Sequence, residues 1–230
     1  MRRLSSLLLA ATLAVLAVAS NAFAGPRFGI SGFTGFQSYQ MGQINSAIHS
    51  IEEALSTTGD RAEIDNLTGN WSYGFGVRAD LTPSWRAYVE YERLGDKTGF
   101  GNNLGAFHFE PAANVIIIGG SYFFPTTNKN RFGFGAGVGL YTFEGTSKAT
   151  LSWYTSTVSG DVDLGGSTTG FHARGEYELT LSDMWSFDAA LGYRWAQGNM
   201  QVNGQDSGTD LDWSGLMTRA GFTVAVGGAR

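Results

Sequence analysis

The three histidines, His49, His108 and His172, are the side chains best suited to acid–base chemistry in this chain. Acyl transfer needs a serine nucleophile with a histidine and an acid within hydrogen-bond reach. Serines are plentiful, but no spacing in the sequence singles out a triad. We interpret His172, which stands four residues before Glu176, as part of an internal polar network, and we predict no catalytic residues and no enzyme.

The segment DVDLGG at 161–166 resembles the opening of a calcium-binding loop, Asp-x-Asp-x-x-Gly. The pattern fails at its end, where His172 stands in place of the required glutamate. We therefore predict a loop turn at 161–166. Weak divalent binding stays open at five acidic residues of the predicted loops: Asp161, Asp163, Asp206, Asp210 and Asp212. The sequence has no phosphate-binding loop, zinc motif or dinucleotide fingerprint, so we predict no metal site and no cofactor.

Composition excludes several classes of protein. The chain has 230 residues, a formal charge of −5 and no cysteine. The acidic balance argues against nucleic acid as a partner, and the lack of cysteine excludes disulfides, thiolate metal sites and a lipid-bearing N-terminal cysteine. With 33 glycines, 13% aromatic residues and only 15% charged residues, the chain matches neither a disordered protein nor an ordinary soluble enzyme. Its length suits one all-β domain.

The N-terminal segment 1–24 has the layout of a secretory signal peptide. Two arginines precede an apolar run over 7–18, and AFA at 22–24 supplies a small-x-small cleavage site. We predict that cleavage leaves one domain over 25–230. Removal of the two arginines leaves 13 of the 15 basic residues against 20 acidic ones, a charge of −7. No later run reaches the roughly 18 apolar residues that a membrane-spanning helix needs.

Alternation of apolar and polar residues marks most of the remaining chain. In 70–81, NWSYGFGVRADL, one set of alternate residues is apolar and the other is small or charged. A strand directs successive side chains to opposite faces. The pattern predicts about eight strands, at 27–39, 70–81, 85–93, 113–124, 131–143, 169–181, 185–195 and 214–226. Two of them are less regular, because 27–39 has glycines on both faces and 113–124 is apolar throughout.

The predicted connections alternate between long and short. The long ones are 41–69, 95–111, 144–168 and 197–212. The short ones are 82–84, 125–130 and 182–184. This order is typical of a closed antiparallel up-and-down β-barrel with one elaborated rim. Both chain ends are then expected on the short-turn side.

Aromatic residues indicate that the apolar face of this barrel meets lipid. They form two predicted belts, near the short turns (Trp85, Phe123, Phe132 and Trp185) and near the long loops (Trp71, Tyr91, Tyr193, Trp195 and Trp213). Such belts are typical of membrane interfaces. In this register Trp71, Tyr73, Phe75 and Val77 face lipid. Closure is required because an open sheet edge in hydrocarbon leaves backbone groups without hydrogen-bond partners.

The opposite face is predicted to fill a narrow lumen. Glycines at 133, 135, 137 and 139 leave room there for side chains from facing strands. Charges of both signs share this face: Arg78, Arg86, Arg174, Arg194, Arg219, Asp80, Glu90, Glu92, Glu176, Glu178 and Asp188. Buried charges must pair, and this set makes pairing feasible. A soluble barrel with the same charges on a solvated outer face is the alternative.

The first long connection, 41–69, contains an amphipathic helix of about four turns. Its apolar residues recur at helical spacing: Met41, Ile44, Ile48, Ile51 and Leu55. We favour a helix that caps the mouth of the barrel. A helix on the membrane surface and a helix that docks a partner are the alternatives.

Residues 25–230 resemble the small outer-membrane β-barrel superfamily of Gram-negative bacteria, the group of the OmpA membrane domain, OmpX and OmpW. The phrases that carry the resemblance run strand, tight turn, strand: WSYGFGVRADLTPSWRAYVEYERL, RFGFGAGVGLY and WSFDAALGYRW. The resemblance implies outer-membrane lipid as surroundings, insertion by the barrel assembly machinery and periplasmic termini. The chain departs from the group at its end, FTVAVGGAR, where Phe222 is the last aromatic residue.

These observations predict a non-catalytic outer-membrane barrel. It would present extracellular loops that serve envelope integrity, adhesion or binding of an extracellular partner. The alternative is transport of small molecules, hydrophobic ones among them, through a narrow or laterally open lumen. A lipid-modifying enzyme is a third, less favoured class. The charged and tyrosine side chains expected in the lumen predict little or no conductance.

Overall fold

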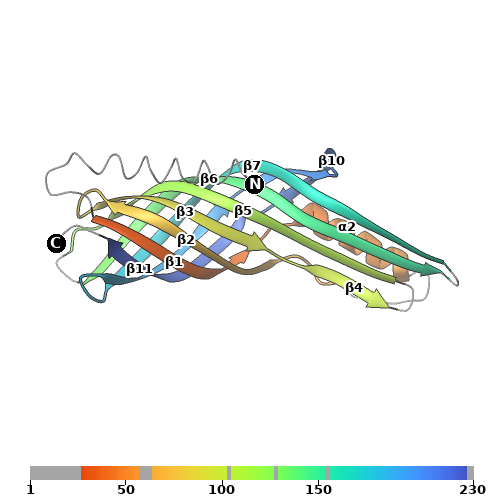
Figure 1. Cartoon of the computed structure of the whole chain (residues 1–230), viewed down its shortest axis with the longest axis horizontal. Helices are drawn as coiled ribbons and strands as arrows, with labels where there is room; N and C mark the ends of the chain where they lie inside the picture. The colour runs from red at the N-terminus through yellow and green to blue at the C-terminus, as the bar shows by residue number, and fades with distance from the viewer. Residues whose placement is uncertain (1–26, 57–63, 103–104, 127–128, 154–155, 227–230) are drawn as a thin grey trace.

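The computed structural model describes residues 27–56, 64–102, 105–126, 129–153 and 156–226. The predicted signal peptide therefore lies outside the described residues. No helix in the described part is long and apolar enough to cross a membrane. The elements follow in the order β1 (Arg27–Ser38), α2 (Gly42–Ser56), β2 (Gly69–Asp80), β3 (Trp85–Gly95), β4 (Thr98–Asn102), β5 (Gly105–Phe123), β6 (Asn130–Trp153), β7 (Ser156–Thr180), β8 (Trp185–Trp195), β9 (Gln197–Val202), β10 (Gln205–Asp212) and β11 (Gly215–Val226) (Figure 1).

Eight strands form a closed antiparallel ring, as the alternation predicts. The order around the ring is β1, β2, β3, β5, β6, β7, β8 and β11. β1 pairs with β11 from Phe28 opposite Val226 to Gln37 opposite Met217, which closes the cylinder. Each of the eight strands thus has a neighbour on both sides, so the ring has no edge strand. β1 begins and β11 ends beside the tight turns, where the N–H of Ala225 donates to the carbonyl of Met184.

The predicted long connections are largely strand, which corrects the interpretation of 95–111, 144–168 and 197–212 as loops. β6 and β7 stay paired as far as Trp153 opposite Ser156. β4 pairs with β5, and β9 pairs with β7 and β10. Serine, threonine and glycine weaken the alternating pattern in these segments, whereas the ladder continues because each strand has a neighbour that satisfies its backbone groups. We call 98–112, 144–165 and 197–212 the extension.

The segment 161–166 lies within β7, so the predicted turn is wrong. Asp161 pairs with Lys148 and Asp163 pairs with Thr146 across the β6–β7 ladder. A calcium loop curls around its ion so that several oxygens converge on one point. An extended strand instead sends Asp161 and Asp163 out side by side on one face of a sheet.

The outer wall of the ring is apolar, which confirms the predicted lipid-facing register. Trp71, Tyr73 and Phe75 are 67%, 60% and 54% exposed. The side chain of Arg78, on the other face of β2, is only 12% exposed and pairs with acidic residues inside the ring. The apolar face of β2 therefore points away from the barrel axis.

Two residues of the predicted aromatic belts are buried instead. Phe123 shares the inward register of Val115 and Ile117, and all three are almost fully buried. Because 113–124 is apolar on both faces, alternation could not separate the inward side from the outward side. Trp213, between β10 and β11, has no exposed surface and packs edge-on against Tyr39, with ring centroids 4.9 Å apart.

In the extension the two faces are exchanged. The outward face carries Lys148 and Asp161, whose side chains are mostly exposed. The inward face carries Phe109 and Leu164, which are buried. Polar outside and apolar inside is the polarity of a protein surface in water. The extension therefore continues the strands of the ring into an aqueous environment.

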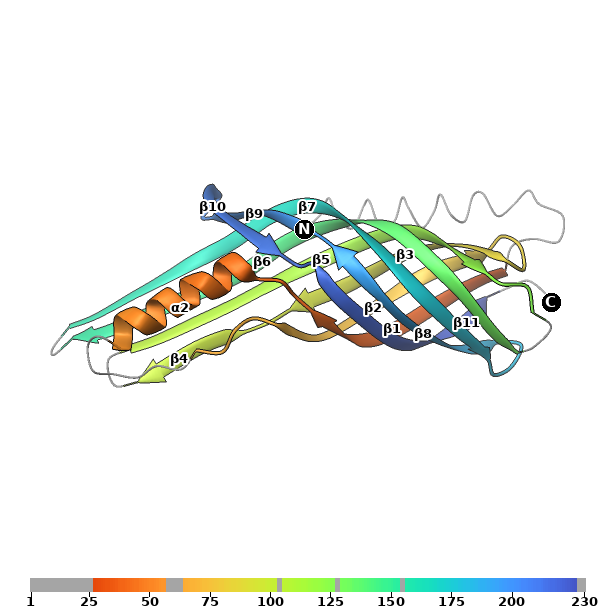
Figure 2. The same cartoon turned by 180° about the vertical axis from the view of Figure 1, so that it is seen from behind.

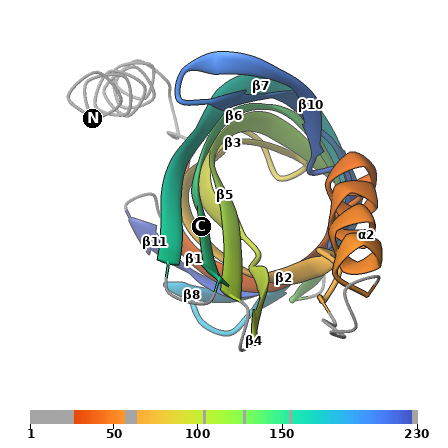
Figure 3. The same cartoon turned by 90° about the vertical axis from the view of Figure 1, so that its right-hand side faces the viewer.

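Helix α2 covers the inward face of the extension. It lies next to β10 at the rim of the cylinder, across the opening from the ends of the long strands (Figures 2 and 3). Met41, Ile44 and Ile48 are buried, whereas Ile51 is exposed; the side chain of Leu55 lies outside what the structure describes. The predicted helix is thus confirmed, and its packing agrees with the favoured capping role.

The residues buried between α2 and the strands form one apolar cluster. Its members are Tyr39, Met41, Ile44, Ile48, Ile64, Leu67, Tyr88, Leu94, Phe109, Ala113, Val115, Ile117, Tyr141, Phe143, Leu164, Ala196, Met200, Leu211 and Trp213. The cluster lies between the charged lumen and the rim that carries the extension. Its members Tyr88 and Tyr141 lie next to two arginines of the lumen, Arg174 and Arg194.

Candidate functional site

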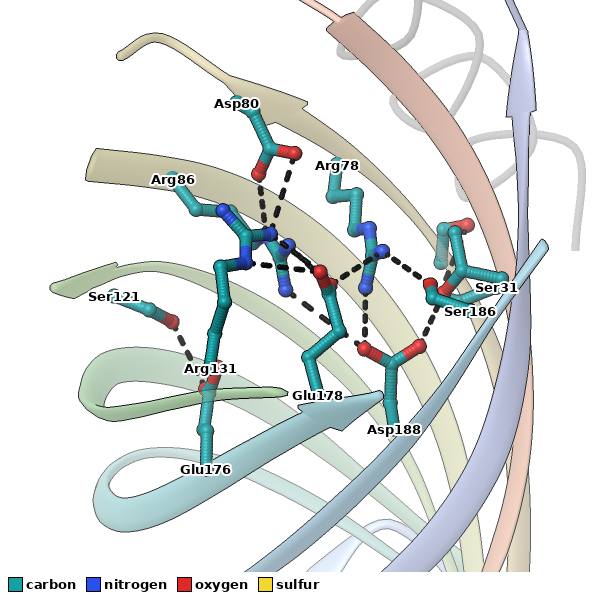
Figure 4. Close-up of polar contacts among 12 residues, drawn as sticks. Ser31, Arg78, Asp80, Arg86, Ser121, Arg131, Glu176, Glu178, Ser186 and Asp188 are labelled. Atoms are coloured by element: carbon teal, nitrogen blue, oxygen red, sulfur yellow. Dashed lines mark hydrogen bonds and ion pairs between the residues drawn. The ribbon is translucent and has the colours of Figure 1, made fainter. Parts of the chain in front are cut away.

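The lumen of the ring is filled by layers of paired charges, and the lowest layer lies nearest the tight turns. Glu178 of β7 accepts hydrogen bonds from three arginines at 2.5–2.7 Å: Arg78, Arg86 and Arg131 (Figure 4). Asp80 accepts from the Nε of Arg86 at 2.7 Å, and Asp188 accepts from Arg78 at 2.6 Å. Five different strands of the ring thus contribute to one network.

A buried aromatic ring supports this lowest layer. The guanidinium groups of Arg86 and Arg131 lie 4.5 and 4.6 Å from the ring centroid of Phe123. A cation over an aromatic face gains attraction that grows when water is excluded. Phe123 therefore orients two of the three arginines while it fills the barrel beside them.

The middle layer is built around Glu90 of β3. Arg174 and Arg219 each donate two hydrogen bonds to its carboxylate, at 2.7–3.0 Å. Arg174 also donates to Glu176 at 2.5 Å, and its guanidinium lies 4.3 Å from the ring centroid of Tyr88. Bidentate pairing fixes both the distance and the plane of each guanidinium.

The upper layer contains one arginine. Arg194 donates to Glu92 at 2.8 Å and to Gln37 at 3.1 Å, and all three side chains are almost fully buried. Ser72 donates to the other oxygen of Glu92 at 2.8 Å. This layer borders the apolar cluster, where the Nε of Arg194 and the hydroxyl of Tyr141 have no hydrogen-bond partner among the described residues.

Across the three layers the charges balance. Six arginines face six carboxylates: Arg78, Arg86, Arg131, Arg174, Arg194 and Arg219 with Asp80, Glu90, Glu92, Glu176, Glu178 and Asp188. The predicted set is confirmed, with Arg131 as an additional member. Arg131 lies on the same face of β6 as the glycines at 133–139, and nothing in the local pattern indicates that it pairs with Glu178 of β7.

The glycines of β6 make space for these layers, as predicted. A Cβ at Gly135 would lie 2.4 Å from an oxygen of Glu176, and one at Gly137 would lie 2.6 Å from the ring of His172. The lumen retains an interior cavity of ≈ 30 Å³ beside Glu90, room for about one or two water molecules. An eight-stranded barrel whose interior is packed in this way has no wide aqueous pore.

The three histidines lie on different elements. His172 of β7 is buried in the middle layer, where its Nε2 lies 2.9 Å from the hydroxyl of Tyr88. His49 of α2 lies 3.0 Å from Glu52, and His108 of β5 lies 3.3 Å from Glu110 on the outward face. His172 is thus part of the lumen network, as interpreted from the sequence. Among the described residues, no group of three or more metal-ligating side chains gathers.

Side-chain hydrogen bonds tie α2 to the segment that follows it. Asn45 exchanges two hydrogen bonds with the backbone of Leu67, at 2.9 and 3.0 Å. Glu52 accepts from the N–H of Ile64 at 2.6 Å. This bond, helped by the contact with His49, lowers the pKa of the Glu52 carboxyl below its usual range. The cap therefore consists of α2 together with 64–67.

The wall of the barrel is interrupted between β2 and β3. Their ladder runs from Asp80 opposite Arg86 to Tyr73 opposite Arg93 and ends there. Above this point 69–72 follows β1, and Leu94 and Gly95 follow β5. A groove of ≈ 180 Å³ lies at the break. No local pattern marks this break, because both strands keep their alternation through it.

No family model and no curated protein matches the chain. The outer membrane protein OprG from Pseudomonas aeruginosa is similar to it, with 13% identity over 87% of this chain and 96% of that chain and a TM-score of 0.49. Neisserial surface protein A has 14% identity over 89% and 99% of the two chains and a TM-score of 0.41. The attachment invasion locus protein Ail of Yersinia pestis has 12% identity over 87% and 97% and a TM-score of 0.40. The closed antiparallel ring of eight strands is the fold that the predicted resemblance implies.

Proposed function

We propose that this protein is a non-catalytic, non-conducting outer-membrane barrel that anchors its extension at the cell surface. One observation carries the proposal: six arginines and six carboxylates neutralise one another inside the ring. A permeating ion would have to break paired, buried charges, which is costly. The barrel is therefore an anchor, and the extension is the part that meets other molecules.

The polarity of the extension supports this role. Its outward face is polar and exposed, so it is suited to contact a hydrated partner, and its inward face is sealed by α2. We place the extension outside the cell and both termini in the periplasm, because the tight turns, the start of β1 and the end of β11 lie at the opposite end of the barrel. Outer-membrane lipid surrounds the ring, and the barrel assembly machinery inserts it.

Bilayer recording combined with a truncation tests the proposal. The mature chain should give no steady current, and a variant in which a tight turn replaces 146–163 should still show different gel mobility before and after boiling. Cells that carry the truncated variant should lose the adhesion or envelope resistance that the full chain confers. Large steady currents from the full chain would refute the anchor role, and unchanged cell behaviour after truncation would refute the role of the extension.

A second candidate function is passage of small hydrophobic molecules through the wall. The break between β2 and β3 favours it, because Leu67 and Leu94 of the apolar cluster lie close behind the break. Uptake of an apolar fluorescent dye by cells with and without the protein tests this route. Equal uptake would exclude it, and would leave the anchor role untouched.

A further inference from the structure

The lipid-facing wall of the ring is recessed over β6, β7 and β8. Gly175 of β7 pairs with Leu191 of β8, and Ala189 pairs with Tyr177, so the two small residues occupy adjacent outward rows of one ladder. Neither has a side chain long enough to continue the wall. A groove of ≈ 450 Å³ lies over them. Phe124, the first residue after β5, also lines it, which places the groove near the tight turns.

Aromatic rings form most of the sides of this groove. Phe132 and Tyr177, on neighbouring strands, have ring centroids 5.0 Å apart, and Phe124 meets Phe134 edge-on at 5.7 Å. Leu191 lines the β8 side and is exposed. Ring pairs of this kind attract one another beyond the area that they bury, so each ring holds its neighbour in place. The groove is therefore apolar and already formed.

The shape of the groove favours an acyl chain as its occupant. Apolar groups that already lie in lipid gain nothing from the hydrophobic effect, so binding inside a bilayer depends on close packing. A recess that stays unfilled forfeits the dispersion contacts of its lining. An acyl chain is narrow and flexible enough to lie along the floor at Gly175 and Ala189. A second barrel has a convex wall, which would reach this floor only with single side chains.

Charged and polar groups lie where the head of such a lipid would be. Asn130 accepts a hydrogen bond from the hydroxyl of Tyr177 at 3.2 Å, which ties the β5–β6 turn to the side of the groove. Lys129 of this turn is exposed, and its carbonyl accepts from the N–H of Thr180 at 2.9 Å. Asp183, exposed in the next turn, follows Thr180 by three residues. A cation and an anion thus lie in neighbouring turns below the groove.

We propose that the groove binds one phospholipid whose head carries both a phosphate and an ammonium group, as in phosphatidylethanolamine. An acyl chain lies on Gly175 and Ala189, the phosphate pairs with Lys129, and the ammonium pairs with Asp183. A head with a phosphate and no ammonium would bring a second negative charge close to Asp183. The site belongs to the ring and not to the extension, so it is independent of the proposed anchor role.

Native mass spectrometry of the refolded mature barrel tests the site, with phosphatidylethanolamine or phosphatidylglycerol added to the detergent. The parent barrel should retain one phosphatidylethanolamine. Ala189→Leu fills the floor and should lower the retained fraction about fivefold, because the acyl chain loses its packing contacts. The control Ala87→Leu, on β3 and outside the groove lining, should match the parent. If Ala189→Leu does not fold, Gly175→Leu takes its place, since a Cβ there would lie at an ordinary 3.7 Å from the carbonyl oxygen of Leu191.

The two charges give a second readout that leaves the floor of the groove intact. Lys129→Gln should lower retention of both lipids about threefold, as loss of an exposed ion pair does. Asp183→Asn should lower retention of phosphatidylethanolamine but not of phosphatidylglycerol. Equal losses in Ala189→Leu and Ala87→Leu would overturn the site, as would retention that is indifferent to both charges. A dimer of barrels that Ala189→Leu abolishes would also overturn it, because the groove would then hold a second copy.

Discussion

The ring and the extension share three strands yet have opposite polarity. On the outward face of β5, Ile118 is 60% exposed in the ring, whereas Glu110 is exposed in the extension. Inside, the ring holds paired ions and the extension holds an apolar cluster. The backbone ladder is continuous through both. Backbone pairing therefore determines where a strand continues, whereas the surrounding medium, lipid or water, determines which side chains its outward face carries.

The two regions also differ in what holds their interiors together. Lumen side chains are fixed by directional charge pairs, whose loss leaves an uncompensated charge in a dry interior. The extension depends on area removed from water, which falls gradually as side chains become smaller. Loss of one charged partner in the ring should therefore cause a large loss of stability in a single step. In the extension, the loss of stability should grow with the apolar area that a substitution removes.

The largest effect is expected from Glu90→Ala. It leaves Arg174 and Arg219 without their shared partner in the lumen, which should lower the free energy of unfolding by about 3–5 kcal/mol. Urea unfolding in lipid vesicles measures it. The matched control is Glu144→Ala, which breaks the more exposed pair with Arg93 and should cost less than about 1 kcal/mol. Equal effects of the two variants would contradict the view that the lumen is dry.

A charge introduced on the outer wall should have the next largest effect on stability. The size of this effect should depend on whether the substituted position of β5 lies in the ring or in the extension. Ile118→Lys places an ammonium on the lipid-facing wall and should destabilise the barrel by about 2–4 kcal/mol. Glu110→Lys, on the same face of β5 in the extension, should change stability by less than about 0.5 kcal/mol. The two variants are compared by their yield of insertion into lipid vesicles and by their free energy of unfolding there. A tolerated Ile118→Lys would place this face in water.

Weakening the cap should loosen the extension without opening the ring. Ile48→Ala removes a buried side chain from α2 and should cost about 2–3 kcal/mol of local stability. Hydrogen exchange of α2 amides should accelerate, while those of β8 should not. Ile51→Ala, at an exposed position on the same helix, serves as the control. Equal exchange in both variants would show that α2 is not held by its apolar face.

The smallest effect concerns the pH dependence of the cap. The pKa of Glu52 is lowered in the folded protein by the hydrogen bond from Ile64, so its carboxylate stabilises the cap above the ordinary glutamate pKa. This contribution is lost as the pH falls through the lowered value. Hydrogen exchange around Ile64 should accelerate under acid conditions, and the Glu52→Gln variant should lack this response. An identical acid response in both would assign it to other groups.

The residue pattern determined the strands of the ring and their polarity. The predicted 185–195 coincides with β8, and 70–81 differs from β2 by one residue at each end, because a period of two is written into the local sequence. The inward direction of Arg78, Arg194 and their acidic partners followed from the same period. The helical spacing from Met41 likewise determined α2, because the period of 3.6 is equally local.

Tertiary structure decided what local periodicity cannot encode. Phe123 lies on a strand that is apolar on both faces, so only closure of the barrel assigned it to the lumen beneath Arg86 and Arg131. The extension, the burial of Trp213 and the break beside Asp96 depend on which strand lies next to which. Asp96 and Gly69, for example, are 27 residues apart in the chain. Pairing partners and the contents of a closed interior are set by the whole cylinder, because each side chain meets neighbours that its own strand does not specify.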